Sequence, residues 1–194
     1  MLRQHYKIQT DVARVYKARS RDRYGWGWAV ATVREWPRGG QLDVQSDFGS
    51  YAYSWSAIGD RTLREFLCGL HFDYFMNKAA AGGGRVFDED ATIRRIKADI
   101  FERARDGCID RETAHEWRDD LDSCGDAGSE HVFAERLMAT DWFYKLYDSY
   151  PGIVMRDSPQ ARAFWDGPWQ ALCAHWKAEA RSASDTEQTG GADA

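Results

Sequence analysis

The chain has 194 residues, of which 43% are hydrophobic and 14% aromatic, and its formal net charge is −5. This amount of apolar material can form a packed interior, so the composition excludes a wholly disordered protein. No apolar run is long enough to cross a membrane, and the first 20 residues lack the apolar core of a secretory signal. We therefore expect a soluble cytoplasmic protein, with its four scattered cysteines reduced.

The first third of the chain predicts β-strands. Alternating side chains separated by turn clusters mark four candidates, at residues 12–18, 24–36, 41–46 and 51–55. The second candidate has apolar residues on both sides, which is typical of a strand buried on both faces. Tyr51, Tyr53 and Trp55 recur at every second position, so they either meet a ligand or are buried. Because helices must cover one sheet face, we favour burial.

After Gly59 the apolar spacing becomes helical. The first predicted helix places Leu63, Phe66, Leu67, Leu70 and Tyr74 on one stripe, and a later one stops at Gly107. The predicted helix starts are Asp60 or Thr62, Asp110, Ser129, Thr140 or Asp141, and Ser158. Pro168 should kink the last helix or begin a new one. The fold class is therefore α+β, an N-terminal antiparallel meander of three to five strands packed against a mainly helical C-terminal part.

The glycine-rich segment 79–85 is the predicted seam between these two parts. We expect residues 1–80 to form the meander and the first helix. Residues 86–180 should form a helical part that shares or abuts the same core. The polar composition of residues 181–194 indicates a flexible tail.

The sequence contains no motif of nucleophilic catalysis, phosphate cradling or dinucleotide binding. The residues Cys108, His115, Cys124 and His131 are of the types that bind zinc. Their spacing, C-x6-H-x8-C-x6-H, lacks the close ligand pair of a structural zinc site. We therefore predict a protein without enzyme activity, and without a bound metal or cofactor.

An acidic block is the main surface feature that the sequence predicts. Residues 110–135 contain nine Asp and Glu against two Arg. Such a block is either a solvated helix face or a surface that docks on a basic groove, including one built for nucleic acid. The candidate partner-binding residues are Glu112, Glu116, Asp119, Asp120, Asp122 and Asp126.

A basic segment beside aromatic residues provides the alternative site. Cations that contact phosphates, next to rings that stack on bases, are typical of single-stranded DNA or RNA binding. The residues of this alternative are Lys17, Arg19, Arg21, Arg23 and Trp26. Nucleic acid is therefore the second candidate partner.

The segment "SDFGSYAYSWSAIG", followed by "LREFL" and "DYFMNK", resembles small uncharacterised proteins encoded by bacteriophages and prophages. Those proteins share a D-[YF]-G-x-[YF]-x-[YF]-x-W strand, an F-x-x-F-L helix and a Y-x-x-x-K pair. "ARAFWDGPWQALCAHW" resembles their closing aromatic helix, whereas Leu63 stands where the first Phe of the helix motif is expected. The resemblance implies a mobile element in a bacterial host. It also implies an accessory protein that inhibits a defence complex, as anti-CRISPR proteins do, by binding a bacterial protein or ribonucleoprotein with a basic surface.

Overall fold

The computed structural model describes residues 8–21, 27–148 and 152–189, with side chains up to residue 183, and divides the chain into two compact units. We call residues 1–84 with 158–194 the sheet unit, and residues 85–157 the helical unit. The helical unit is therefore an insertion between two segments of the sheet unit.

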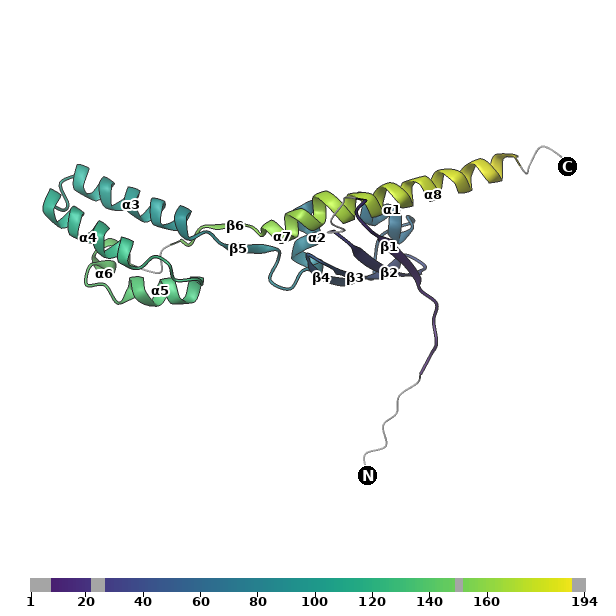
Figure 1. Ribbon diagram of the computed structural model, residues 1–194, viewed down its shortest axis with the longest axis horizontal. Coiled ribbons are helices and arrows are strands. Elements are labelled where there is room, and N and C mark those ends of the chain that lie inside the picture. Colours follow the sequence, from purple (N-terminus) through teal and green to yellow (C-terminus); the bar gives the residue numbers. More distant parts are fainter. Residues whose placement is uncertain (1–7, 22–26, 149–151, 190–194) are drawn as a thin grey trace, which may run out of the picture. The chain divides into compact units, whose positions relative to one another are not determined.

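The sheet unit contains a four-stranded antiparallel meander whose strands pair in chain order (Figure 1). Its strands are β1 (Arg14–Ala18), β2 (Ala29–Trp36), β3 (Gly39–Ser46) and β4 (Gly49–Trp55). Two-residue turns join the longer strands, because Trp36 pairs with Gly39 and Ser46 pairs with Gly49. The predicted N-terminal meander and the α+β class are confirmed.

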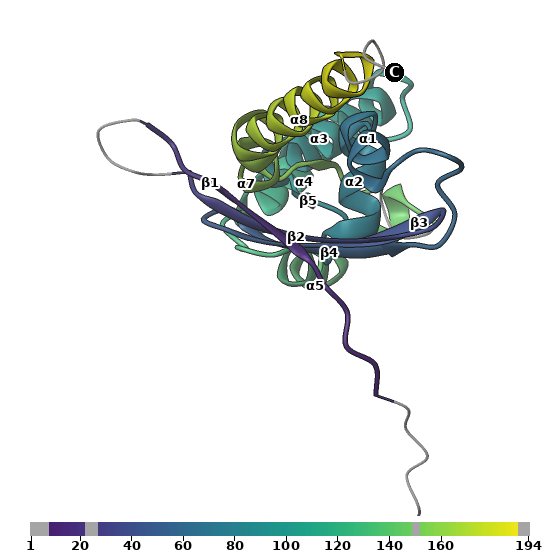
Figure 2. The same cartoon turned by 90° about the vertical axis from the view of Figure 1, so that its right-hand side faces the viewer.

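Helices cover one face of this sheet (Figure 2). They are α1 (Leu63–Cys68), α2 (Phe72–Ala79), α7 (Pro159–Phe164), the π-helical turn η1 (Trp165–Trp169) and α8 (Gln170–Thr189). Thr62 and Glu65 form the capping box that starts α1. The single predicted helix from Thr62 past Tyr74 was wrong, because α1 ends at Cys68 and His71 is extended. The predicted interruption at Pro168 is the π-helical turn.

The aromatic side chains of β4 form part of the core under these helices. Tyr51 and Trp55 are each 4% exposed, and the Tyr51 ring stacks on Phe164 with centroids 4.1 Å apart. Burial, and not ligand contact, therefore explains their spacing, as predicted. The expectation that β2 is buried on both faces was wrong. Val30 and Thr32 on its other side are only half-buried, because the helices cover one face.

The helical unit has its own core, which is separate from that of the sheet unit. Its elements are β5 (Arg85–Phe87), α3 (Glu89–Arg105), α4 (Arg111–Ser123), α5 (Glu130–Met138), α6 (Phe143–Leu146) and β6 (Met155–Asp157). Ile100, Leu121 and Phe133 are fully buried in this core. The short strands β5 and β6 pair with each other, and the sequence pattern had predicted neither.

The boundary between the parts differs from the expected 86–180. Helices α7 and α8 return to the sheet, where Phe164, Leu172 and Trp176 join the core of the meander. At the return point the Ser158 N–H donates to the Gly84 carbonyl oxygen over 2.8 Å. Apolar spacing shows that a helix has a buried face, but not which element covers that face.

The expected flexible tail, residues 181–194, also differs from the structure, because α8 continues to Thr189. Residues 190–194 lie outside the described residues. Residues 181–189 contain neither Gly nor Pro, so a helix that begins earlier can continue through them although their composition is polar. Among the described helices, none combines the length and apolar character that crossing a membrane requires.

Candidate functional site

Helix α4 carries the predicted acidic face. Asp110 caps the helix by accepting a hydrogen bond from the Thr113 N–H over 2.8 Å, and hydrogen bonds to this carboxylate lower its pKa. Ala114, Trp117 and Leu121 form the buried stripe of α4. The helical period therefore turns a carboxylate stripe to the opposite side, away from the core. The stripe consists of the exposed residues Glu112, Glu116 and Asp119, flanked by Asp120 and Asp122.

Some of these carboxylates have partners. Asp122 pairs with Lys97 at 2.6 Å, and Asp119 lies 3.2 Å from the His115 imidazole. The carboxylates of Glu112, Glu116 and Asp120 make no hydrogen bond or ion pair with any described residue. The helical unit holds 18 Asp and Glu against 11 Lys and Arg, so its formal charge is −7. The outward side of α4 thus keeps a net negative charge.

Asp126 is separate from this stripe. It lies in the loop between α4 and α5 with a left-handed backbone, φ +52°. Glu89 holds the loop by accepting hydrogen bonds from the Asp126 and Ala127 N–H groups, at 2.6 and 3.1 Å. The structure therefore brings five of the six predicted residues onto one helix.

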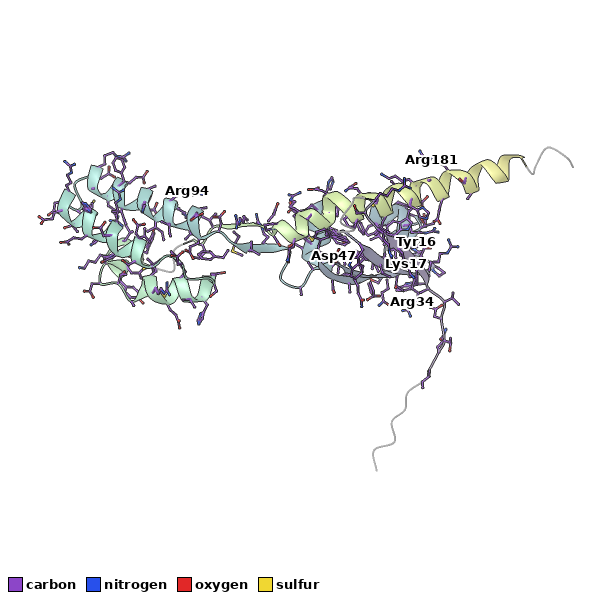
Figure 3. All side chains as sticks on the ribbon, in the orientation of Figure 1. Tyr16, Lys17, Arg34, Asp47, Arg94 and Arg181 are labelled. Carbon is purple, nitrogen blue, oxygen red and sulfur yellow. The ribbon has the colours of Figure 1, made fainter. Side chains whose placement is uncertain are left out.

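The alternative basic site lies at one end of the β1–β2 pair. Lys17, labelled in Figure 3, is exposed and alternates with the buried Tyr16, so it lies on the open face of the sheet. Arg19 and Arg21 follow β1 as exposed residues. Arg23 and Trp26 lie outside the described residues. Lys17, Arg19 and Trp28 line a depression of about 480 Å³. Trp28 is 36% exposed. Its backbone N–H donates a hydrogen bond to the Asp47 carboxylate over 3.2 Å.

A third candidate is a groove of about 1320 Å³ between α1 and α8, which sequence reasoning missed. Arg64, which lines the groove, is the centre of an ionic network. The guanidinium donates to Glu179 over 2.9 Å and to the Tyr16 hydroxyl over 3.3 Å, and it pairs with Glu35 at 3.3 Å. Burial opposes the charge of Arg64, whereas Glu35 and Tyr16 stabilise it, so its pKa is raised overall. These residues come from β1, β2, α1 and α8, so no local spacing could reveal them.

The four candidate zinc ligands, Cys108, His115, Cys124 and His131, do not form a cluster in the structure. Cys108 is exposed in the turn after α3, whereas Cys124 is buried and its Sγ donates to the Asp120 carbonyl oxygen over 3.4 Å. Burial raises the pKa of the Cys124 thiol. His131 pairs with Glu135 within α5. Within the described part of the chain, no three His, Cys, Asp or Glu side chains are arranged to hold a metal ion.

Comparison with known proteins identifies the family. No curated protein and no solved structure matches the chain. The model of the Phage_phiTE_072 family, described as a phage family, matches residues 6–171. The match includes the whole helical unit and the complete meander, and it agrees with the phage resemblance of the sequence motifs. The chain therefore belongs to this phage family.

Proposed function

We propose that this phage-family protein is a non-enzymatic binding protein that acts in the cytoplasm of an infected bacterium. It docks the acidic face of α4 on a basic, nucleic-acid-binding surface of a bacterial defence complex, as an anti-CRISPR protein does. The observation that carries the proposal is the stripe of exposed carboxylates, Glu112, Glu116 and Asp119, opposite the buried stripe of the same helix. Such a stripe supports docking on a surface of complementary charge.

The geometry favours recognition over catalysis at this face. Catalytic carboxylates are usually desolvated or paired so that their pKa values suit proton transfer. The carboxylates of α4 are exposed on a convex helix surface, where they attract a cationic partner over a distance set by the ionic strength. Binding should therefore weaken as salt is added.

The proposal is tested by mixing the protein with purified CRISPR effector complexes and measuring co-elution and DNA binding by the effector. Co-elution with loss of DNA binding is expected. The double variant Asp119→Lys with Asp120→Lys should abolish both effects. The matched control is Glu102→Lys with Asp141→Lys, which reverses two exposed carboxylates of the same unit outside α4 and should bind as the parent does. Binding that survives the α4 reversal unchanged would refute the acidic-face mechanism.

A second function is favoured by the open depression beside Trp28. An exposed indole next to Lys17 and Arg19 supports stacking of a base with contacts to its phosphates. Single-stranded oligonucleotides should then quench tryptophan fluorescence at low salt, and Trp28→Ala with Lys17→Glu should remove the quenching. Fluorescence that stays flat over the titration excludes this function.

A further inference from the structure

The groove between α1 and α8 holds positive charge that no described side chain neutralises. Nine polar or charged side chains line it, and its wall also includes Cys68 and Trp176. The charged and polar residues are Arg14, Thr62, Arg64, Glu65, His175, Lys177, Glu179, Arg181 and Ser182. Four are Lys or Arg, two are Glu, and Figure 3 labels Arg181 on α8. Which of these charges already have partners decides what the groove can bind.

Both carboxylates that line the groove have partners. Glu179 accepts from Arg64 over 2.9 Å and lies 3.3 Å from the His175 imidazole. Glu65 accepts from the N–H and the hydroxyl of Thr62, at 2.9 and 3.0 Å, within the capping box. These hydrogen bonds to Thr62 lower the pKa of Glu65. With four Lys or Arg against these two Glu, the lining of the groove keeps a formal charge of +2.

Three of the four cations lack such partners. Arg14, Lys177 and Arg181 are exposed, and none makes a hydrogen bond or ion pair with a described residue. Lys177 and Arg181 are one helical turn apart, so they point to the same side of α8. Arg14 comes from the edge strand β1, on the side of the sheet that the helices cover. In the same wall, the indole N–H of Trp176 is buried without an acceptor among the described residues.

We propose that this groove binds a phosphate-bearing ligand. Arg14, Lys177 and Arg181 contact the phosphate oxygens. The network around Arg64 fixes α1 against α8 and β1, so the groove is formed before the ligand arrives. Charge-assisted hydrogen bonds from Lys and Arg are the strong contacts of phosphate recognition. This site lies on the helix-covered side of the sheet, so it is distinct from the open-face depression beside Trp28.

Binding is measured by titration calorimetry with three probes, inorganic pyrophosphate, ATP and a twelve-residue oligothymidylate. Saturable binding of at least one probe is expected, and failure of all three overturns the proposal. Binding of pyrophosphate and ATP alone identifies a free phosphate compound as the source. Tighter, strongly salt-dependent binding of the oligonucleotide identifies a nucleic-acid strand.

Two variants locate the site. Lys177→Glu with Arg181→Glu should weaken binding by about a hundredfold or more, since it removes two charge-assisted contacts that contribute about 1.5–3 kcal/mol each. Arg38→Glu with Lys78→Glu reverses two exposed cations elsewhere in the sheet unit and should leave the affinity within about twofold. Trp28→Ala should leave it unchanged. Equal loss in the groove variant and the control would overturn the assignment to this groove.

Cys68 provides an independent readout. It is half-buried in the groove, and its Sγ donates to the Cys173 carbonyl oxygen over 3.6 Å. A side-chain interaction with Cys173, together with the positive charges of Lys177 and Arg64, lowers the pKa of the Cys68 thiol. Alkylation by N-ethylmaleimide, followed by peptide mass mapping, should slow at Cys68 when pyrophosphate is bound and stay constant at the exposed Cys108. An unchanged rate at Cys68 under saturating ligand would place the ligand elsewhere and overturn the proposal.

Discussion

The sheet unit should fold without the helical unit when a two-residue turn replaces residues 85–157. The Ser158 N–H donates to the Gly84 carbonyl oxygen over 2.8 Å, which is the i to i+3 hydrogen bond of a β-turn. An Asn-Gly pair between these residues supplies the type I′ turn that fits this geometry. All buried residues of the meander's core belong to the sheet unit. The deletion therefore removes none of that core.

The expected gain follows from loop closure. The replaced span is 73 residues, and shortening it to two corresponds to roughly five halvings of loop length. Each halving lowers the entropic cost of closing the loop by about 0.6 kcal/mol, so the upper bound on the gain is about 3 kcal/mol. The shortened chain should therefore unfold at the same or a higher urea concentration than the sheet unit in the full chain.

The assay is urea unfolding followed by tryptophan fluorescence and by far-UV circular dichroism. A single cooperative transition with helix and sheet signals is expected. The control is a second deletion, of residues 86–156, in which the same Asn-Gly pair joins Arg85 to Asp157. These two residues pair across β5 and β6, so a two-residue turn can also join them. A shortened chain that is unfolded without urea would refute the independence of the sheet unit's core.

Three further predictions concern single substitutions. Phe75→Ala should lower the free energy of unfolding by about 3–5 kcal/mol, because Phe75 is fully buried, whereas Phe101→Ala, at a side chain 64% exposed, should change it by about 0.5 kcal/mol or less in urea unfolding. Gly40→Ala should cost about 1–3 kcal/mol by the same assay, because the added Cβ would lie 2.7 Å from a backbone oxygen. Burial and a hydrogen bond to Asp99 raise the pKa of Tyr147, so the stability of the helical unit should fall as pH rises above about 10, where the unfolded tyrosine ionises. Tyr147→Phe, compared by urea unfolding at pH 8 and 10.5, should reduce that fall, and an identical decline would contradict the assignment.

Features that depend on neighbouring residues were predictable from the sequence. Asp110, Ser129 and Ser158 were identified as helix caps, and each accepts a hydrogen bond from the N–H three residues ahead. The alternation of Tyr51 and Trp55 likewise indicated the face of β4 that helices cover. In these cases the interacting residues are only a few positions apart, so their spacing in the sequence predicts the interaction.

The α1–α8 groove was not predictable, because its contacts join distant parts of the chain. Tyr16 and Glu179 are 163 residues apart, and Arg64 lies between them in sequence. Each residue alone resembles an ordinary surface residue. The packing of α7 and α8 on the sheet was not predictable for the same reason, since the apolar face of an amphipathic helix does not specify the element that covers it.

Because the helical unit is an insertion, the net charge of the whole chain describes neither unit by itself. The sheet unit holds 15 Lys and Arg against 13 Asp and Glu, whereas the helical unit has a formal charge of −7. The value of −5 for the whole chain therefore averages a mildly basic unit with an acidic one. Exposed charges are screened over about 8 Å at physiological ionic strength, so a ligand responds to the charges around its site and not to the total. The proposed phosphate site at Arg14, Lys177 and Arg181 and the proposed docking face of α4 are therefore compatible within one acidic protein.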